Sequence, residues 1–169
     1  MAERIKITFL GTGTSQGVPV IACDCETCTS DDVRDKRLRT SVLIEKDDTC
    51  LIIDAGPDFR QQMLRENVRK LDAILLTHEH KDHIAGMDDV RAFNYKSQDA
   101  IDIYAEERVQ KTIKREFSYV FSEYQYPGIP RMRLNDIPDY RFVVKGINVV
   151  PIRVRHMNLE IFGFRIGNF

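Results

Sequence analysis

A run of metal-binding residue types begins at His78 and ends at His83, directly after the apolar stretch from Leu71 to Leu76. Imidazole and carboxylate are ligands that proteins use for Zn²⁺, Mn²⁺ and Fe. His78 and His80 are two residues apart, so both side chains point to the same side if the backbone is extended. Asp82 and His83 follow after a bend and can address a second point in space. This single segment therefore predicts a site for two metal ions, with Asp82 supplying an oxygen ligand.

The alternative is a solvated loop that is polar without a function. Three histidines within six residues, in a chain that has four histidines in all, argue against it. The fourth, His156, also ends an apolar run, which begins at Val149. Metal binding is therefore the favoured interpretation.

Three of the four cysteines, Cys23, Cys25 and Cys28, have C-x-C-x-x-C spacing in a polar loop. This spacing suits thiolate ligation of zinc, whereas disulfides are rare in a reducing compartment. Tetrahedral zinc requires four ligands and the loop provides three, so three free thiols remain the alternative. Cys50, at the start of an expected strand, is interpreted as an ordinary buried thiol.

The metal-binding run needs a sheet to hold it, and the apolar pattern predicts the strands. Residues 4–10 alternate and are rich in β-branched residues, and residues 39–45 and 50–54 form a hairpin pattern. Gly11 and Gly13 follow the first strand and are expected to allow a tight turn with positive φ. The spacing lacks the Lys and Ser/Thr of a nucleotide-binding loop. Tight packing near the metal site is therefore favoured over a phosphate cradle.

Helices are predicted over residues 57–67, 87–93 and 106–117. In the first of these, apolar residues that include Leu64 share one face and are assigned to the core. In the last, apolar residues recur every four positions, which is typical of an amphipathic helix.

Further short strands are expected at residues 100–104 and between residues 131 and 166, with turns at Pro138 and Gly146. The aromatic run at residues 117–126 is expected to pack under a loop. A role in lining a substrate pocket is the alternative.

The chain of 169 residues is 43% hydrophobic and 30% charged with a net charge of −1, which is ordinary for one soluble domain. The near-neutral charge argues against a nucleic-acid or membrane-surface partner. The chain starts without a signal-peptide pattern, and no apolar run reaches the ~18 residues of a membrane span. We therefore expect a cytoplasmic protein with a single domain, residues 1–169, that carries a Cys-rich loop at 21–30.

Other motifs narrow this interpretation. The chain contains FLGTGTSQGVP at residues 9–19, the cysteine loop at 23–28, LIIDAGPDFR at 51–60 and GFRIG at 163–167. Together with HxHxDH after a strand, these stretches resemble the metallo-β-lactamase fold of metal-dependent hydrolases over nearly the whole chain. Within this fold they are similar to the phosphoribosyl cyclic phosphate phosphodiesterase subfamily of the carbon–phosphorus lyase pathway.

The resemblance implies an α+β fold, a metallo-β-lactamase-like αββα sandwich in which two β-rich halves pack face to face between helices. The first half is expected to be complete and the second half incomplete. The family's next ligands, an Asp that bridges both metals and a late His, would lie beyond Phe169, so a C-terminally truncated chain is expected. An incomplete second sheet favours association, with a homodimer as one form.

The resemblance also assigns roles to the ligand residues. His78, His80 and His156 would hold one metal ion. Asp82 and His83 would hold part of a second and act as the catalytic residues.

Two further assignments come from the same resemblance. The family's counterpart of Asp54 accepts hydrogen bonds behind the ligand loop, which implies a supporting role for Asp54. In the family, zinc at the loop of Cys23, Cys25 and Cys28 takes its fourth ligand from a histidine near the C-terminus.

Two metal ions about 3.5–4 Å apart can share a water, lower its pKa and deliver hydroxide to a phosphorus centre. We therefore predict a dinuclear phosphodiesterase for small phosphodiesters, cyclic ribose phosphodiesters among them. Zinc or manganese is expected at the active site and a structural zinc at the cysteine loop. The alternatives are a hydrolase of the same fold that acts on thioesters, lactams or RNA 3′ ends, and a non-catalytic zinc-binding module. The neutral charge disfavours RNA.

Overall fold

The computed structural model describes residues 4–124 and 126–169, and nine strands in this part of the chain form two sheets. The larger sheet has six strands in sequence order: β1 (Lys6–Gly11), β2 (Ser41–Lys46), β3 (Thr49–Ile53), β4 (Ala73–Leu75), β5 (Ile101–Ala105) and β6 (Met132–Asp136). The smaller sheet contains β7 (Phe142–Val144), β8 (Ile147–His156) and β9 (Leu159–Arg165).

The helices of the described residues are short. They are α1 (Glu26–Thr29), α2 (Phe59–Arg65), α3 (Lys81–Ile84), α4 (Arg91–Ser97) and α5 (Glu107–Glu116), with 3₁₀ turns η1 (Val33–Asp35), η2 (Met87–Val90) and η3 (Ser118–Val120). None of them is long and apolar enough to cross a membrane.

The larger sheet changes from antiparallel to parallel at β3. β1, β2 and β3 pair antiparallel, whereas β3, β4, β5 and β6 pair parallel. Parallel neighbours need crossover connections, which here contain α2, α3, α4 and α5. The carboxyl ends of β3, β4 and β5 therefore meet at one edge of the sheet, where loops can assemble a site.

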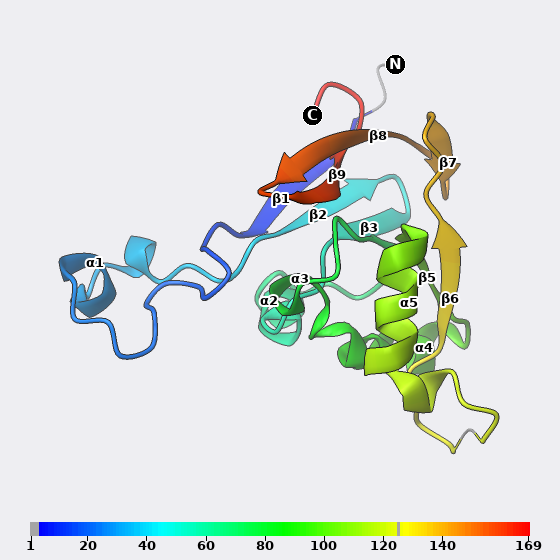
Figure 1. The fold of residues 1–169 in the computed structure, drawn as a ribbon, viewed down its shortest axis with the longest axis horizontal. Helices are drawn as coiled ribbons and strands as arrows, with labels where there is room; N and C mark the ends of the chain where they lie inside the picture. The colour runs from blue at the N-terminus through cyan, green and yellow to red at the C-terminus, as the bar shows by residue number, and fades with distance from the viewer. Residues whose placement is uncertain (1–3, 125) are drawn as a thin grey trace.

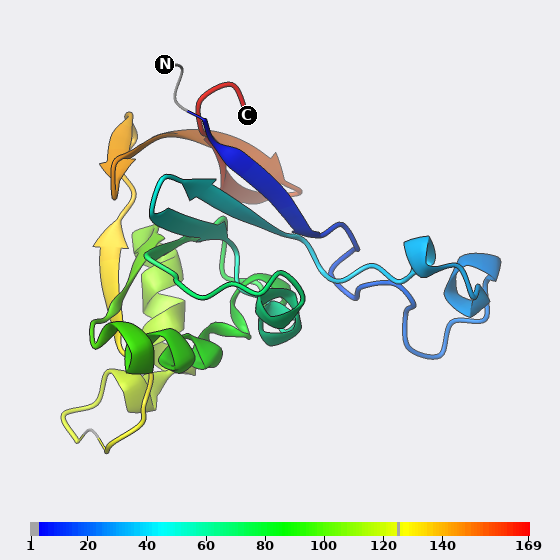
Figure 2. The same ribbon diagram turned by 180° about the vertical axis from the view of Figure 1, so that it is seen from behind.

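Figures 1 and 2 show helices α2 to α5 on one side of the larger sheet and the smaller sheet on the other. Side chains alternate across the central strands, so each strand contributes to two apolar cores. Ile52 and Ile74 pack toward the helices with Phe59, whereas Leu51 and Leu75 pack toward β7, β8 and β9. Burial on both faces explains why β4 lies within a continuous apolar run.

Most elements lie where the pattern predicts them. The expected hairpin is confirmed by the antiparallel pairing of β2 and β3, and the expected helix at 106–117 by α5. The helix expected at 87–93 is divided between η2 and α4. Of the aromatic run, Phe117 is buried and Tyr124 is 82% exposed, while residue 125, like residues 1–3 at the start of the chain, lies outside the described residues.

The assignment of Leu64 to the core is wrong, because its side chain is 63% exposed. Helix α2 has 7 residues and buries Phe59, Gln62 and Met63. Successive side chains of a helix point in different directions, so Leu64, which comes directly after the buried Met63, lies off the buried face and points to solvent.

The expected positive φ at Gly11 and Gly13 is also wrong. Instead, these glycines allow two backbone segments to approach closely. A Cβ atom at Gly11 would lie 2.0 Å from the carbonyl oxygen of Arg39, and one at Gly13 would lie 2.6 Å from that of Arg37. Among the described residues, positive φ occurs at other glycines: Gly17, Gly128, Gly146 and Gly167.

One segment leaves the body of the molecule. The part of the chain that contains α1 and η1 projects away from both sheets (Figure 1). It carries the cysteine loop, so the cysteines and the histidine-rich run lie in separate parts of the fold.

Candidate metal centre

Three imidazoles converge at the carboxyl end of β4. His78 and His80 follow this strand, and His156 is the last residue of β8. One nitrogen of each ring lies within 4.8 Å of the others, and His78 Nε2 is 3.1 Å from His80 Nδ1. Three nitrogens directed at one point fit a divalent ion such as zinc. The fold thus brings together the three residues that were expected to share the first metal.

Asp82 and His83, which were expected to hold part of a second metal, lie in α3 beside this group. His83 Nε2 is 3.1 Å from Asp82 Oδ2, and the ring centroids of His83 and His78 are 4.0 Å apart. The donor set of the site therefore comprises four imidazoles and one carboxylate, a combination that suits zinc, manganese or iron.

Asp54 lies behind the ligands and organises them. Its side chain is 1% exposed. It accepts hydrogen bonds from the backbone N–H and the hydroxyl of Thr77, at 2.9 and 2.8 Å, and from His83 Nδ1 at 2.6 Å. Because the Thr77 hydroxyl donates its hydrogen to Asp54, its oxygen accepts one from His78 Nδ1 at 2.9 Å. Both imidazoles therefore carry hydrogen on Nδ1, which leaves Nε2 of His78 beside the ring of His80 and Nε2 of His83 beside the carboxylate of Asp82.

The surroundings of each histidine determine its protonation. Burial, together with the charge of His83, lowers the pKa of His78 to about 4, so this ring is neutral at neutral pH. Burial also acts to lower the pKa of His83, but the hydrogen bond and charge of Asp54, with the charge of Asp82, raise it overall. His78 is therefore ready to bind a metal ion, whereas a protonated His83 must first lose its proton.

A sharp turn after β3 places Asp54 under the ligand loop. Asp54 has a φ of 60°, in the left-handed region, and Ala55 N–H donates to the carbonyl of His83 at 2.8 Å. Gly56 follows, and a Cβ atom there would lie 1.9 Å from the carbonyl oxygen of Asp82. This position has no room for a side chain, so glycine lets the turn and α3 pack backbone to backbone.

A cavity of about 530 Å³ opens over the donor groups. All five of these side chains line it, and so do Thr14, Ser15, Thr40 and Ile161. These wall residues were not predicted from the sequence. The glycine-rich turn after the first strand was the available signal, and the fold places Gly13, Thr14 and Ser15 of this turn at the cavity with the histidines. The cavity suits a small ligand with polar groups.

Asp54→Asn is expected to lower the free energy of unfolding by about 1–3 kcal/mol and to weaken metal binding. Asparagine keeps the size of the side chain and tolerates a left-handed φ. The substitution therefore mainly removes the negative charge and one hydrogen-bond acceptor of Asp54. An amide N–H would then face Thr77 or His83, where the carboxylate now accepts hydrogen bonds. Urea unfolding of the metal-free protein and a zinc titration measure the two effects.

Asp47→Asn is the matched control for that variant. Asp47 also has a left-handed φ, of 50°, but it is exposed in the turn between β2 and β3. Equal effects of the two substitutions would show that the buried hydrogen bonds of Asp54 contribute nothing.

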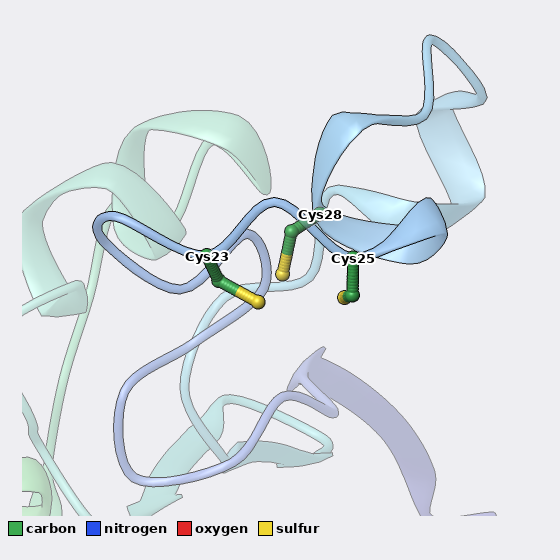
Figure 3. A group of neighbouring side chains, drawn as sticks. All are labelled: Cys23, Cys25 and Cys28. Atoms are coloured by element: carbon green, nitrogen blue, oxygen red, sulfur yellow. The ribbon is translucent and has the colours of Figure 1, made fainter.

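Cys23, Cys25 and Cys28 gather in the projecting segment (Figure 3). Their sulfur atoms lie within 4.8 Å of one another, and no fourth candidate ligand from the described residues joins them. Val20 N–H donates to Cys28 Sγ at 3.3 Å. Hydrogen bonds from the Cys28 backbone and from the neighbouring thiols lower the pKa of Cys25. The lowered pKa favours the thiolate form of Cys25, and thiolate is the form that binds zinc. The hydrogen bond from Val20 N–H acts to lower the pKa of Cys28, but burial and the two neighbouring thiols raise it overall.

Cys25→Ala is expected to remove one zinc ion per chain and to lower Tm, because a structural zinc contributes to folding. Elemental analysis and thermal unfolding measure these effects. Cys50→Ala serves as the control, since Cys50 is buried, with its pKa raised to about 12 mainly by that burial. It should leave the zinc content unchanged. An unchanged zinc content and Tm in Cys25→Ala would show that the three cysteines hold no metal.

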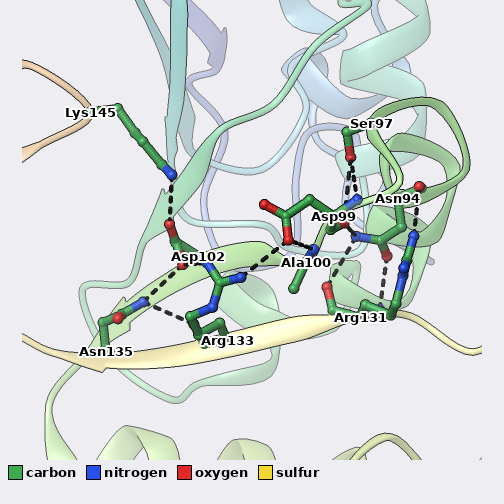
Figure 4. Close-up of polar contacts among 9 residues, drawn as sticks. All are labelled: Asn94, Ser97, Asp99, Ala100, Asp102, Arg131, Arg133, Asn135 and Lys145. Carbon is green, nitrogen blue, oxygen red and sulfur yellow. Dashed lines mark hydrogen bonds and ion pairs between the residues drawn. The ribbon is translucent and has the colours of Figure 1, made fainter.

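His156 lies at the tip of the hairpin formed by β8 and β9. The other end of this hairpin, where β8 begins, is anchored by Asp102 of β5 (Figure 4). Asp102 accepts a hydrogen bond from Arg133 of β6 at 2.7 Å and pairs with Lys145 at 3.1 Å. The carbonyl of Lys145 accepts from the hydroxyl of Thr49 at 2.9 Å. The turn before β8 is therefore joined to β3, β5 and β6, which orients the smaller sheet on the larger one.

Comparison with known sequences gives one family match and several relatives. Residues 49–168 match the model of the β-lactamase superfamily domain. An octanoyltransferase of Porphyromonas gingivalis is 44% identical over 165 residues, which is 96% of this chain and 33% of that protein. Coenzyme PQQ synthesis protein B of Methylobacterium radiotolerans is 34% identical over 98 residues, which is 49% of this chain and 32% of that protein. The matches cover about a third of the length of these relatives.

Solved structures extend the likeness to the fold. A diphosphatase of the PhnP family matches with a TM-score of 0.87 and 39% identity, over 97% of this chain and 63% of that one. Zn²⁺-bound PqqB from Methylobacterium extorquens matches with a TM-score of 0.71 and 20% identity, over 98% of this chain and 60% of that one. The arrangement of the helices, the larger sheet and the smaller sheet is therefore shared with these two solved structures.

Proposed function

This chain belongs to the β-lactamase superfamily and has a metallo-β-lactamase fold, and from that premise we propose that it is a metal-dependent hydrolase of small phosphodiesters or related phosphorus–oxygen bonds. The observation that carries the proposal is the convergence of four imidazoles and one carboxylate on a cavity of about 530 Å³. The likeness to a diphosphatase, at 39% identity, supports phosphorus chemistry.

We assign His78, His80 and His156 to one metal ion and Asp82 with His83 to a second. Imidazole and carboxylate suit zinc and manganese alike. When bound, two such ions would lower the pKa of a coordinated water and would neutralise charge on phosphoryl oxygens.

The other side chains orient the ligands and the substrate. Asp54, directly and through Thr77, keeps the hydrogens of His78 and His83 on Nδ1, so that Nε2 of each ring faces the site. Thr14, Ser15 and Thr40 also line the cavity, and their hydroxyl groups can donate hydrogen bonds to anionic oxygens. A phosphoryl group would thus meet both the positive charge of bound metal ions and hydroxyl donors of the cavity wall.

A thioester hydrolase is the second candidate, since an octanoyltransferase is 44% identical to this chain. That match covers 33% of the relative, so most of the chain that its name describes has no counterpart here. Within the described residues that line the cavity, Ile161 is the large aliphatic side chain and the others are polar or small. A polar wall favours a phosphoryl group over a medium-length acyl chain.

The test uses the protein at its natural length, loaded with Zn²⁺ or Mn²⁺. A cyclic ribose phosphodiester, a diphosphate diester and an octanoyl thioester are offered separately, with and without a chelator. The proposal expects chelator-sensitive cleavage of a phosphorus–oxygen bond. Cleavage of the thioester alone would favour the second candidate. Metal-loaded protein that cleaves none of them would contradict the proposal and favour a zinc-binding module.

A further inference from the structure

The residues between the metal ligands contact α5. Glu79 pairs with Arg108 near the start of this helix, and Lys81 pairs with Glu116 at its end. The side chain of Lys81 is 66% exposed, so its pair stabilises little. The side chain of Glu79 is only 20% exposed. The Glu79–Arg108 pair is therefore the stronger attachment of the ligand loop to the helix.

Arg108 also contacts the hairpin of β8 and β9, which carries His156. Its Nη1 contacts the carboxylate of Glu79. Its Nη2 donates to the backbone carbonyl of Glu160 at 2.8 Å and to the carboxylate of Glu106 at 3.3 Å. Glu160 is the second residue of β9. One guanidinium thus bridges the ligand loop, the junction of β5 with α5, and the hairpin.

The tip of this hairpin is open to solvent. His156 is exposed, and the next residue, Met157, is 87% exposed with a φ of 56°. Phe162 N–H donates to the carbonyl of Thr77 at 3.1 Å, which joins the hairpin to the residue before His78. The place of His156 relative to the other two imidazoles therefore depends on the contacts that hold this hairpin. They include the bridge through Arg108 and the pair of Arg153 of β8 with Glu106, at 2.9 Å.

We propose that Arg108 is a positioning residue for the metal centre. It holds the hairpin against the ligand loop, so that His156 stays within reach of the ion bound by His78 and His80. This inference rests on the proposed metal-dependent function, but it concerns a residue that belongs neither to the five donor side chains nor to the lining of the cavity.

The chemistry of arginine suits this task. Its guanidinium presents N–H groups in a rigid planar fork, so Nη1 and Nη2 can serve separate acceptors at the same time. Lysine has one ammonium group on a flexible chain and cannot replace both contacts. Glu79 Oε2 is buried and has no hydrogen-bond partner among the described residues. Without Arg108, a mostly buried carboxylate between two ligands would lose its counter-ion.

Mn²⁺ binding to the metal-free protein at its natural length tests the inference. Mn²⁺ prefers nitrogen and oxygen ligands to thiolates, so it reports the histidine centre, and its EPR signal distinguishes free from bound ion. Arg108→Gln is expected to weaken binding about 10- to 100-fold, as is usual for residues that orient metal ligands. Arg115→Gln is the matched control on the same helix, since Arg115 is 73% exposed and pairs with Glu116. Its Mn²⁺ affinity should equal that of the wild type.

Two further variants keep the test decisive if Arg108→Gln folds poorly. Glu79→Gln removes one arm of the bridge and is also expected to weaken binding, and Arg108→Lys is expected to recover little of the loss. Wild-type affinity in both Arg108→Gln and Glu79→Gln would overturn the inference and leave the proposed function standing. Full recovery in Arg108→Lys would overturn it too, because a point charge would then suffice. A wild-type protein that binds neither Mn²⁺ nor Zn²⁺ at its histidines would overturn both.

Discussion

Replacing His80 with alanine is expected to reduce metal-dependent turnover at least about 100-fold, since changes that only disturb the support of a ligand already cost about 10- to 100-fold. His80 Nδ1 lies 3.1 Å from His78 Nε2 within the three-histidine group. The side chain is exposed, so little packing is lost, and the free energy of unfolding should change by less than about 0.5 kcal/mol. Turnover with added Zn²⁺ or Mn²⁺ and urea unfolding of the metal-free protein measure the two quantities.

Lys111→Ala controls for that experiment, because Lys111 is exposed on α5 and pairs with Glu107. It should retain wild-type turnover. Wild-type turnover in His80→Ala would remove His80 from the metal centre. A loss of activity that only follows a large loss of stability would indicate a structural role instead.

A second large effect is expected from Gly56→Ala, which should destabilise the fold by about 3 kcal/mol or more. The added methyl group would lie 1.9 Å from the carbonyl oxygen of Asp82 and 2.8 Å from its carbonyl carbon. Both are backbone atoms, so no rotation of a side chain relieves the clash. The turn must move away from α3, which breaks the hydrogen bond of 2.8 Å from Ala55 N–H to the carbonyl of His83. Denaturant unfolding measures the loss of stability.

The same movement displaces Asp82 and His83, so Gly56→Ala should also weaken Mn²⁺ binding. Gly163→Ala is the control: the nearest atom to its new Cβ would be the carbonyl oxygen of Ile152, at 3.8 Å, which is ordinary contact. Its stability should stay within about 1 kcal/mol of the wild type. If both variants were equally stable, the close approach of the turn to α3 would be contradicted.

Much of the fold was predictable because strands buried on both faces leave long apolar runs. The hairpin of β2 and β3 and the strand β4 lie where this pattern places them. The face of a short helix was less predictable. Helix α2 turns Phe59 and Met63 inward and Leu64 outward, because the layer it packs against, and not the apolar character of each residue, determines the buried face.

The glycines of the first loop show a similar limit. Gly11 and Gly13 were expected to adopt positive φ, but they are needed because the carbonyl groups of Arg39 and Arg37 leave no room for a Cβ atom. A glycine in a sequence indicates that the backbone is unusual there. It does not show whether conformation or a neighbouring segment is the reason.

The sequence by itself determined which ligand types are present and which of them lie together along the chain. The run from His78 to His83 and the loop from Cys23 to Cys28 were recognisable because ligands a few residues apart share one stretch of local backbone. The resemblance to a known family already implied that His156 joins the first group, and the tertiary structure brings the three rings together. Only the tertiary structure decided that Arg108 bridges the ligand loop to the hairpin of β8 and β9, and that the cysteines lie apart in a projecting segment. These relations arise where the two sheets and α5 pack together, and packing between distant segments follows no local spacing.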